Sequence, residues 1–202
     1  MISQKYKFIF IHVPKTAGNS IHDTLRDYID DKLILKSQMQ DGVERFGLKN
    51  TSYPSLNKHS RLSEYYKYLG DSICDYKIYT TIRNPFDKLI SYYFSPHRWH
   101  QTTNKQPKWD YHKIELILNQ MPELRWFINT PALMDNIKFL KYETINGDFN
   151  KMCEEVGLPK LNLSHRNKST NRSDYRIYYN NRLIDLIYNK HKFEISIGNY
   201  QY

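Results

Sequence analysis

The feature that most constrains the fold lies near the start of the chain, in residues 8–25, FIFIHVPKTAGNSIHDTL. Residues 6–13 are apolar or aromatic almost throughout and lack helical spacing, which predicts a strand buried on both faces of a parallel sheet. A short loop with one glycine follows, and a helix is expected from Asn19 or Ser20. Apolar residues then recur at helical spacing, at Ile21, Leu25, Tyr28 and Ile29. Strand, tight loop and helix together form the first part of an α/β unit.

A second unit of the same kind covers residues 76–94, YKIYTTIRNPFDKLISYYF. β-Branched and aromatic residues predict a strand over 76–82, after which Asn84 is a candidate N-cap with Pro85 at the first helical position. Later segments continue the alternation, with helices predicted over 111–120, 147–159 and 178–192 and a strand over 137–143. This alternation predicts an α/β fold with three layers (α/β/α) and a central parallel sheet, in a single domain over residues 1–202.

The composition narrows the class of partner. The 202 residues carry a formal net charge of +9, which favours an anionic partner but does not choose among nucleic acid, acidic glycan, a phospholipid surface and a charged cofactor. No apolar run approaches the roughly 18 residues of a membrane span, and the N-terminus lacks a secretory signal, so we expect a soluble, cytoplasmic protein. Cys74 and Cys153 lack metal-binding spacing and are expected to be buried, reduced thiols.

The first loop is related to the Walker A pattern GxxxxGK[ST] but differs from it. Gly18 and Ser20 match, whereas Val13 stands in place of the first glycine and Asn19 in place of the lysine. The N–H groups of a helix N-terminus still favour an anion. The residues that hold a triphosphate with magnesium are missing, because the second strand ends in Arg83 and not in a carboxylate.

Two other interpretations of this loop stay open. One is a nucleotide kinase with aberrant motifs, in which Glu143, after a later strand, supplies the missing carboxylate. The other is an ordinary strand-to-helix turn with a solvated Lys15.

Residues 12–20, HVPKTAGNS, resemble the 5′-phosphosulfate loop of sulfotransferases that use 3′-phosphoadenosine 5′-phosphosulfate (PAPS), especially the carbohydrate sulfotransferases. The second cofactor motif of that family is also similar: a strand ending in arginine, then Asn-Pro, then a helix with a serine eight residues after the arginine. This sequence has Arg83, Asn84, Pro85 and Ser91 in that arrangement. The resemblance implies a sulfotransferase fold of the P-loop NTPase-like type, PAPS as co-substrate and no metal.

The resemblance also assigns roles to individual residues. It implies that the 5′-phosphate is held by the loop residues Lys15, Thr16, Ala17, Gly18, Asn19 and Ser20. Arg83 and Ser91 would hold the 3′-phosphate, and Lys15 would neutralise the oxygen between phosphorus and sulfur as that bond breaks. A weaker similarity in residues 161–179 gives phosphate contacts to Lys168 and Ser169, with a basic solvated loop as the alternative.

A base for the acceptor proton should titrate near neutrality, which directs attention to the eight histidines. His59 is the candidate, because the resemblance places a catalytic histidine in a similar His-Ser segment before a short helix. The alternative is that His59 only caps or packs against that helix. His12, at the strand end, is expected to make a structural hydrogen bond. If the base is a carboxylate, Glu64 and Asp110 are the candidates.

The acceptor is expected to be a glycan or a small hydroxyl compound bound by residues 92–113. The aromatic residues expected to stack on sugar rings are Trp99, Trp109 and Tyr111, although the tryptophans suit core or loop contacts equally well. The residues expected to attract an anionic glycan are Arg98, Lys105 and Lys108.

The function expected from all of this is transfer of the sulfuryl group from PAPS to a hydroxyl of a carbohydrate or related acceptor. A basic nucleic-acid-binding protein is the alternative from another class, suggested by the charge and by 18 tyrosines. No RNP-type or zinc motif supports it, so no nucleic acid partner is expected.

Overall fold

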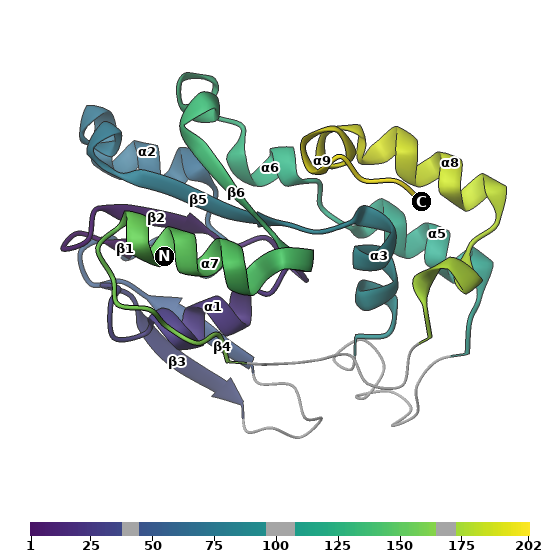
Figure 1. The fold of residues 1–202 in the computed structure, drawn as a ribbon, viewed down its shortest axis with the longest axis horizontal. Helices are drawn as coiled ribbons and strands as arrows, with labels where there is room; N and C mark the ends of the chain where they lie inside the picture. The colour runs from purple at the N-terminus through teal and green to yellow at the C-terminus, as the bar shows by residue number, and fades with distance from the viewer. Residues whose placement is uncertain (38–44, 96–107, 165–172) are drawn as a thin grey trace.

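The computed structural model describes residues 1–37, 45–95, 108–164 and 173–202 (Figure 1). At its centre is a four-stranded sheet in the order β1-β2-β5-β6. These strands are β1 Ile2–Ser3, β2 Phe8–Ile11, β5 Lys77–Ile82 and β6 Ile137–Lys141. The pairs β2–β5 and β5–β6 are parallel, as predicted.

The edge strand β1 departs from the predicted parallel sheet, because it pairs with β2 in the antiparallel direction. Only residues 4–7 separate the two strands, and a parallel pair needs a crossover of a dozen or more residues. The central sheet is therefore mixed. Helices flank it, while the finer P-loop NTPase-like arrangement stays a prediction.

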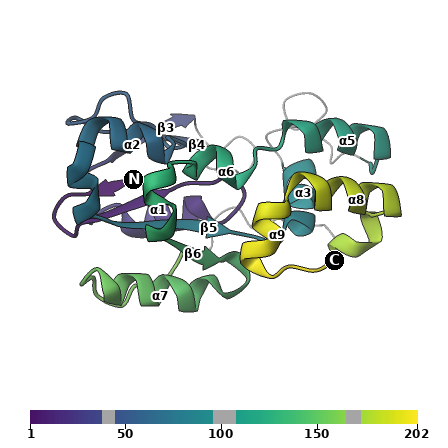
Figure 2. The ribbon, with the colours of Figure 1, turned by 90° about the horizontal axis from the view of Figure 1, so that it is seen from above.

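The burial of β2 explains how the sheet is covered. All four residues of its FIFI sequence are buried, and successive side chains point to opposite faces. Ile9 and Ile11 pack with residues of α2 Leu62–Leu69 and α6 Leu124–Ile128. Phe8 and Phe10 pack with residues of α1 Gly18–Leu25 and α7 Ile145–Glu155. Figure 2 shows α2 and α7 on opposite sides of the sheet.

Helix α1 begins one residue before the predicted start and ends at Leu25. Tyr28 and Ile29, which the helical spacing included, lie beyond the helix but pack against the same core cluster. The apolar spacing therefore predicted correctly that these two residues face the core, but it predicted too long a helix.

A further group of helices lies beside the carboxyl ends of the strands (Figures 1 and 2). It contains α3 Pro85–Tyr93, α5 Tyr111–Gln120, α8 Asn181–Lys190 and α9 Lys192–Gly198. The side chain of Asn84 accepts a hydrogen bond from the N–H of Phe86 over 3.0 Å, which confirms it as the N-cap of α3. The single helix predicted over 178–192 is wrong in extent, because α8 and α9 meet at the fully buried His191.

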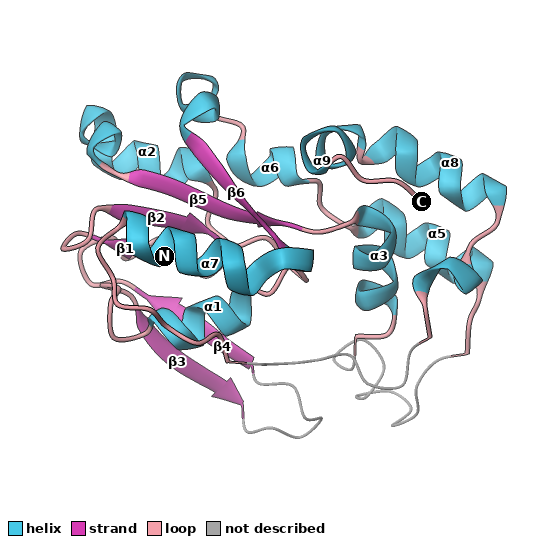
Figure 3. Cartoon of the chain, in the orientation of Figure 1, coloured by secondary structure: helices cyan, strands magenta, loops and turns pink. Residues whose placement is uncertain are grey.

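The fold also contains a hairpin that was not predicted from the sequence. Strands β3 Lys32–Ser37 and β4 Arg45–Lys49 form a separate antiparallel hairpin (Figure 3). Cys74 is exposed, contrary to the expectation, although Cys153 is buried and both thiols are free.

Short 3₁₀ helices cover Gly70–Asp75, Pro131–Asn136, Tyr142–Thr144 and Tyr175–Tyr178. Within the described ranges, no helix has the length and apolar character needed to cross a bilayer.

Candidate active site

The loop after β2 holds two residues in an uncommon backbone conformation. Lys15 and Ala17 have φ angles of 66° and 72°, in the left-handed region, which costs a non-glycine residue about 1–3 kcal/mol. Such residues persist where the surrounding structure fixes them, and they concentrate at ligand sites. Here Arg83 restrains the loop, because its Nη1 donates a hydrogen bond to the main-chain oxygen of Lys15 over 2.8 Å.

Thr16 also restrains the loop, through two hydrogen bonds of its hydroxyl group. Its hydroxyl donates to the main-chain oxygen of Val13 over 2.8 Å and lies 2.5 Å from the Thr81 hydroxyl on β5. A hydroxyl has one proton, so Thr81 is the donor in the second contact. The Thr16 hydroxyl therefore holds the loop against the sheet.

The N-terminus of α1 is the part of the loop best suited to a phosphate. Ala17 is the N-cap and has no polar side chain to satisfy the first turn. The N–H groups of Gly18 and Asn19, in the first turn of the helix, have no acceptor within the helix, and the positive end of the helix dipole lies with them. An anion with several oxygens would satisfy these donors.

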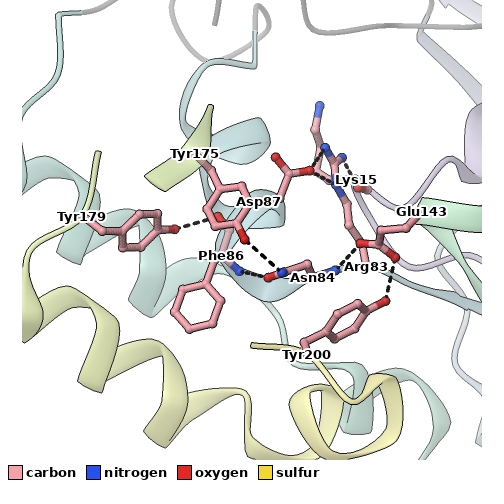
Figure 4. A network of polar contacts seen from close by, with 9 residues as sticks. All are labelled: Lys15, Arg83, Asn84, Phe86, Asp87, Glu143, Tyr175, Tyr179 and Tyr200. Atoms are coloured by element: carbon pink, nitrogen blue, oxygen red, sulfur yellow. Dashed lines mark hydrogen bonds and ion pairs between the residues drawn. The ribbon is translucent and has the colours of Figure 1, made fainter. Parts of the chain in front are cut away.

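Arg83 is not a surface arginine, because only 4% of it is exposed. Its Nε and Nη2 donate to Asp87 Oδ2 over 2.8 and 2.5 Å, and its guanidinium carbon lies 3.9 Å from the centre of the Tyr142 ring. Together with the bond to Lys15, these contacts join the end of β5, helix α3 and the loop (Figure 4). The pairing with Asp87 was not predicted from the sequence, because Arg83 lies before the start of α3, where the i, i+4 spacing of a helix does not apply.

Ser91, the other residue expected at the 3′-phosphate, is buried on α3 two turns after Arg83. Lys168 and Ser169 lie outside the described residues, as do Trp99, Arg98 and Lys105. The 3′-phosphate contacts of Arg83, Ser91, Lys168 and Ser169 thus stay predictions.

Glu143 is held by a network at the start of α3 (Figure 4). One carboxylate oxygen accepts from the N–H of Asn84 over 2.8 Å, and the other from the hydroxyl of Tyr200 over 2.9 Å. Both oxygens are therefore used within the protein, which weakens the kinase alternative that needs this carboxylate for magnesium. Among the described residues, no group of three or more His, Cys, Asp or Glu side chains is arranged to hold a metal ion.

The side chain of Lys15 extends from the loop to the end of α3. Its Nζ donates a hydrogen bond to Ser95 Oγ over 3.1 Å, and the residue is partly buried. These contacts weaken the alternative of an ordinary turn with a solvated Lys15. The amine is therefore held just after the end of α3.

His59 lies beside the strand end that leads into the loop. Its Nδ1 is 3.1 Å from the main-chain oxygen of His12, and the two rings meet edge to face with centroids 4.6 Å apart. Burial lowers the pKa of His59 below its ordinary value, although the hydrogen bond to His12 acts in the opposite direction. A lowered pKa keeps the imidazole neutral at pH 7, which is the state that accepts a proton.

His12 and His22 extend this cluster into the interior, with ring centroids 4.8 Å apart. Burial lowers the pKa of both well below the ordinary value, and nearby positive charge at Lys58 adds to the effect. The hydrogen bond expected of the His12 ring is not made at Nδ1, which is buried without a hydrogen-bond partner in the described part of the chain. The main-chain oxygen of His12 makes the structural bond instead.

The two carboxylates considered as alternative bases both cap helices. Glu64 accepts from the N–H of Arg61 over 2.6 Å at the start of α2. Asp110 accepts from the N–H groups of His112 and Lys113 at the start of α5. These structural tasks favour His59 as the base.

Of the residues expected to bind the acceptor, Trp109 packs against Tyr93, Phe94 and Tyr178, so the alternative of a core contact describes it better. Tyr111 is 44% exposed. Recognition of a glycan by these residues stays a prediction.

Comparison with known proteins adds to this geometry. The sequence model of a family described as "Sulfotransferase family" matches residues 1–201. No curated protein matches the chain in sequence. A crystal structure of a sulfotransferase from Alicyclobacillus acidocaldarius aligns with 97% of this chain and 96% of that chain, at 15% identity and a TM-score of 0.46.

Proposed function

Since the chain belongs to the sulfotransferase family, we propose that it transfers the sulfuryl group of PAPS to a hydroxyl group of a carbohydrate or related small acceptor, with residues 1–202 acting as one domain. The observation that supports this most is the bond between Arg83 and Lys15. The two residues come from separate motifs, and the bond brings both motifs to the same edge of the sheet, where one ligand reaches them together.

The charge and backbone of this edge fit the two ends of a bisphosphate. The N–H groups at the start of α1 suit the 5′-phosphate, and the guanidinium of Arg83 with the Ser91 hydroxyl suits the 3′-phosphate. Arg83 has five N–H donors, of which Asp87 and Lys15 use those at Nε, Nη1 and Nη2 in three bonds. The two remaining N–H donors of Arg83 are proposed to bind the phosphate, with Lys168 and Ser169 as further contacts.

The reaction proposed is an in-line displacement at sulfur. The acceptor oxygen forms a bond to sulfur while the bond from sulfur to the 5′-phosphate oxygen breaks, which gives a sulfate ester and adenosine 3′,5′-bisphosphate. Lys15 stabilises the negative charge that develops on the leaving oxygen, and His59 accepts the proton of the acceptor hydroxyl. Positioning and electrostatics supply the rest, as in phosphoryl transfer, and no residue of this scheme needs a metal.

The proposal is tested by transfer of labelled sulfate. Purified protein is incubated with ³⁵S-labelled PAPS and a panel of neutral and acidic oligosaccharides and small alcohols, and radioactivity in the acceptor is measured. We expect label in at least one hydroxyl compound, with loss of that label in His59→Gln. Transfer with ATP and magnesium, but not with PAPS, would support the kinase alternative and contradict the proposal.

A further inference from the structure

His12 connects the phosphate-binding loop to the proposed base. It follows β2 directly and lies three residues before Lys15. Its main-chain oxygen is bonded to His59, and its ring, with the residue only 3% exposed, packs between the rings of His22 and His59. The same residue therefore contacts the base through its backbone and through its side chain.

The backbone contact determines which nitrogen of His59 carries the proton. A carbonyl oxygen only accepts hydrogen bonds, so Nδ1 must be the donor in the 3.1 Å contact. In the neutral ring the lone pair is then on Nε2, which is the atom able to take a proton from an acceptor hydroxyl. After proton transfer Nδ1 still donates to His12, so the ring keeps its orientation through the reaction.

The ring of His12 also fixes the start of α1. A Cβ atom built on Gly18 would lie 2.2 Å from Cδ2 and 2.3 Å from Nε2 of His12, closer than any real carbon contact. The imidazole is therefore seated against the α-carbon of Gly18, the first residue of the phosphate-binding helix. The side chain is absent at position 18 because the ring occupies its place.

We propose that His12 is a positioning residue: its main-chain oxygen selects the reactive tautomer of His59, and its ring, seated on Gly18, sets the place of that base relative to the phosphate loop. This inference rests on the proposed function for its catalytic meaning. The charged groups near the three histidines are Lys58 and the amino group of Met1, and both disfavour protonation of the imidazole rings.

The first test measures the tautomer directly, without substrate. Protein labelled with ¹⁵N-histidine is examined by long-range ¹H–¹⁵N correlation at pH 8, and His59→Gln assigns the signal. One hydrogen bond favours the donating tautomer roughly tenfold, so we expect at least about a tenfold excess of the Nδ1–H form. A predominant Nε2–H form, or an even mixture, would overturn the proposal.

The second test uses Gly18→Ala, His12→Ala and the double variant, with the His59 tautomer ratio as the readout. We expect Gly18→Ala to reduce the excess several-fold in the wild-type background and to have no further effect in His12→Ala, because the ring that it strikes is gone. An equal effect of Gly18→Ala in both backgrounds would contradict the seat of His12 on Gly18. Gly147→Ala on α7 is the matched control, because its Cβ would meet no described atom within 4 Å.

Binding of adenosine 3′,5′-bisphosphate is measured on the same samples by calorimetry. Wild-type protein that fails to bind it, with the expected tautomer ratios intact, would refute the proposed function and leave the geometry of His12 standing. Binding with an even tautomer mixture would refute the role of His12 alone.

Discussion

The guanidinium of Arg83 donates a hydrogen bond to the main-chain oxygen of Lys15 over 2.8 Å, which ties the end of β5 to a loop whose backbone is left-handed at that residue. The bond crosses between two motifs that are 68 residues apart in the chain. A buried cation thereby holds the loop in the shape that presents the N–H groups of α1.

Replacing the lysine should separate binding from chemistry. Lys15→Ala removes the charge that meets the leaving oxygen, so we expect turnover to fall on the order of 10²- to 10³-fold while bisphosphate affinity changes by less than about fivefold. Steady-state kinetics with calorimetry measures both, and Lys151→Ala on the exposed side of α7 is the control. Loss of affinity equal to the loss of turnover would contradict the role given to Lys15.

Replacing Arg83 should chiefly weaken binding of the bisphosphate and should also destabilise the loop. Arg83→Lys keeps the charge but loses the planar fork that serves Asp87 and Lys15 together, so bisphosphate affinity should fall at least about tenfold. Thermal unfolding should shift down by several degrees, because the buried cation can no longer make all three hydrogen bonds to Asp87 and Lys15.

The matched control for this change is Arg182→Lys, where an exposed arginine pairs with Glu115 on the surface. An exposed pair contributes little, so neither affinity nor stability should change measurably. Similar effects of the two substitutions would show that Arg83 acts only through general charge.

Acid should destabilise the fold through the buried histidines. Burial lowers the pKa values of His12 and His22 in the folded state. Below the unfolded value of about 6.5 the unfolded chain therefore binds more protons than the folded protein, and the free energy of unfolding decreases as the pH is lowered. At pH 5 each histidine that stays neutral removes about 2 kcal/mol. Urea unfolding between pH 7.5 and 5 measures the slope.

His22→Leu introduces a side chain that cannot titrate. It should reduce the slope of the free energy of unfolding against pH by the contribution of one histidine. His112→Leu, on the exposed face of α5, is the control for an added leucine. An unchanged slope in His22→Leu would mean that His22 takes up a proton as readily in the folded protein as in the unfolded chain.

Lys88 offers a stabilising substitution. Burial lowers its pKa to about 8, although the carboxylate of Glu194 acts in the opposite direction, and its Nζ donates to the oxygen of Pro122 over 3.3 Å. Between about pH 8 and 10.5 the unfolded chain binds the proton more tightly, so stability should rise with pH in that window. Lys88→Met should raise the free energy of unfolding at pH 7 by about 1–3 kcal/mol and abolish the rise, as urea unfolding would show. A less stable Met variant at pH 7 would contradict this.

The local features of this fold could be predicted because neighbouring residues determine them. The buried strand before the loop, the Asn84 cap and the strand ending in Arg83 each depend on a few adjacent side chains. The antiparallel edge strand β1 could not, because two residues carry too little pattern to identify a strand. The hairpin of β3 and β4 was missed although the sequence carries a turn dipeptide, Asp41-Gly42, between the two strands.

The candidate site shows the same division between local and tertiary information. The resemblance named Lys15 and Arg83 separately, but their contact depends on the parallel pairing of β2 with β5. The seat of His12 on Gly18 depends on how close helix α1 comes to the strand end, and no spacing in the sequence encodes that distance. Glu64 and Asp110 were weighed as bases because their capping bonds are visible only in the structure.

Calorimetric titration of the protein with adenosine 3′,5′-bisphosphate and, separately, with ADP tests the proposed function most directly. We expect the bisphosphate to bind at least about tenfold more tightly, without magnesium, because Arg83 and Ser91 are proposed to recognise a phosphate at the 3′ position. Equal affinity for the two nucleotides, or no binding of either, would contradict it.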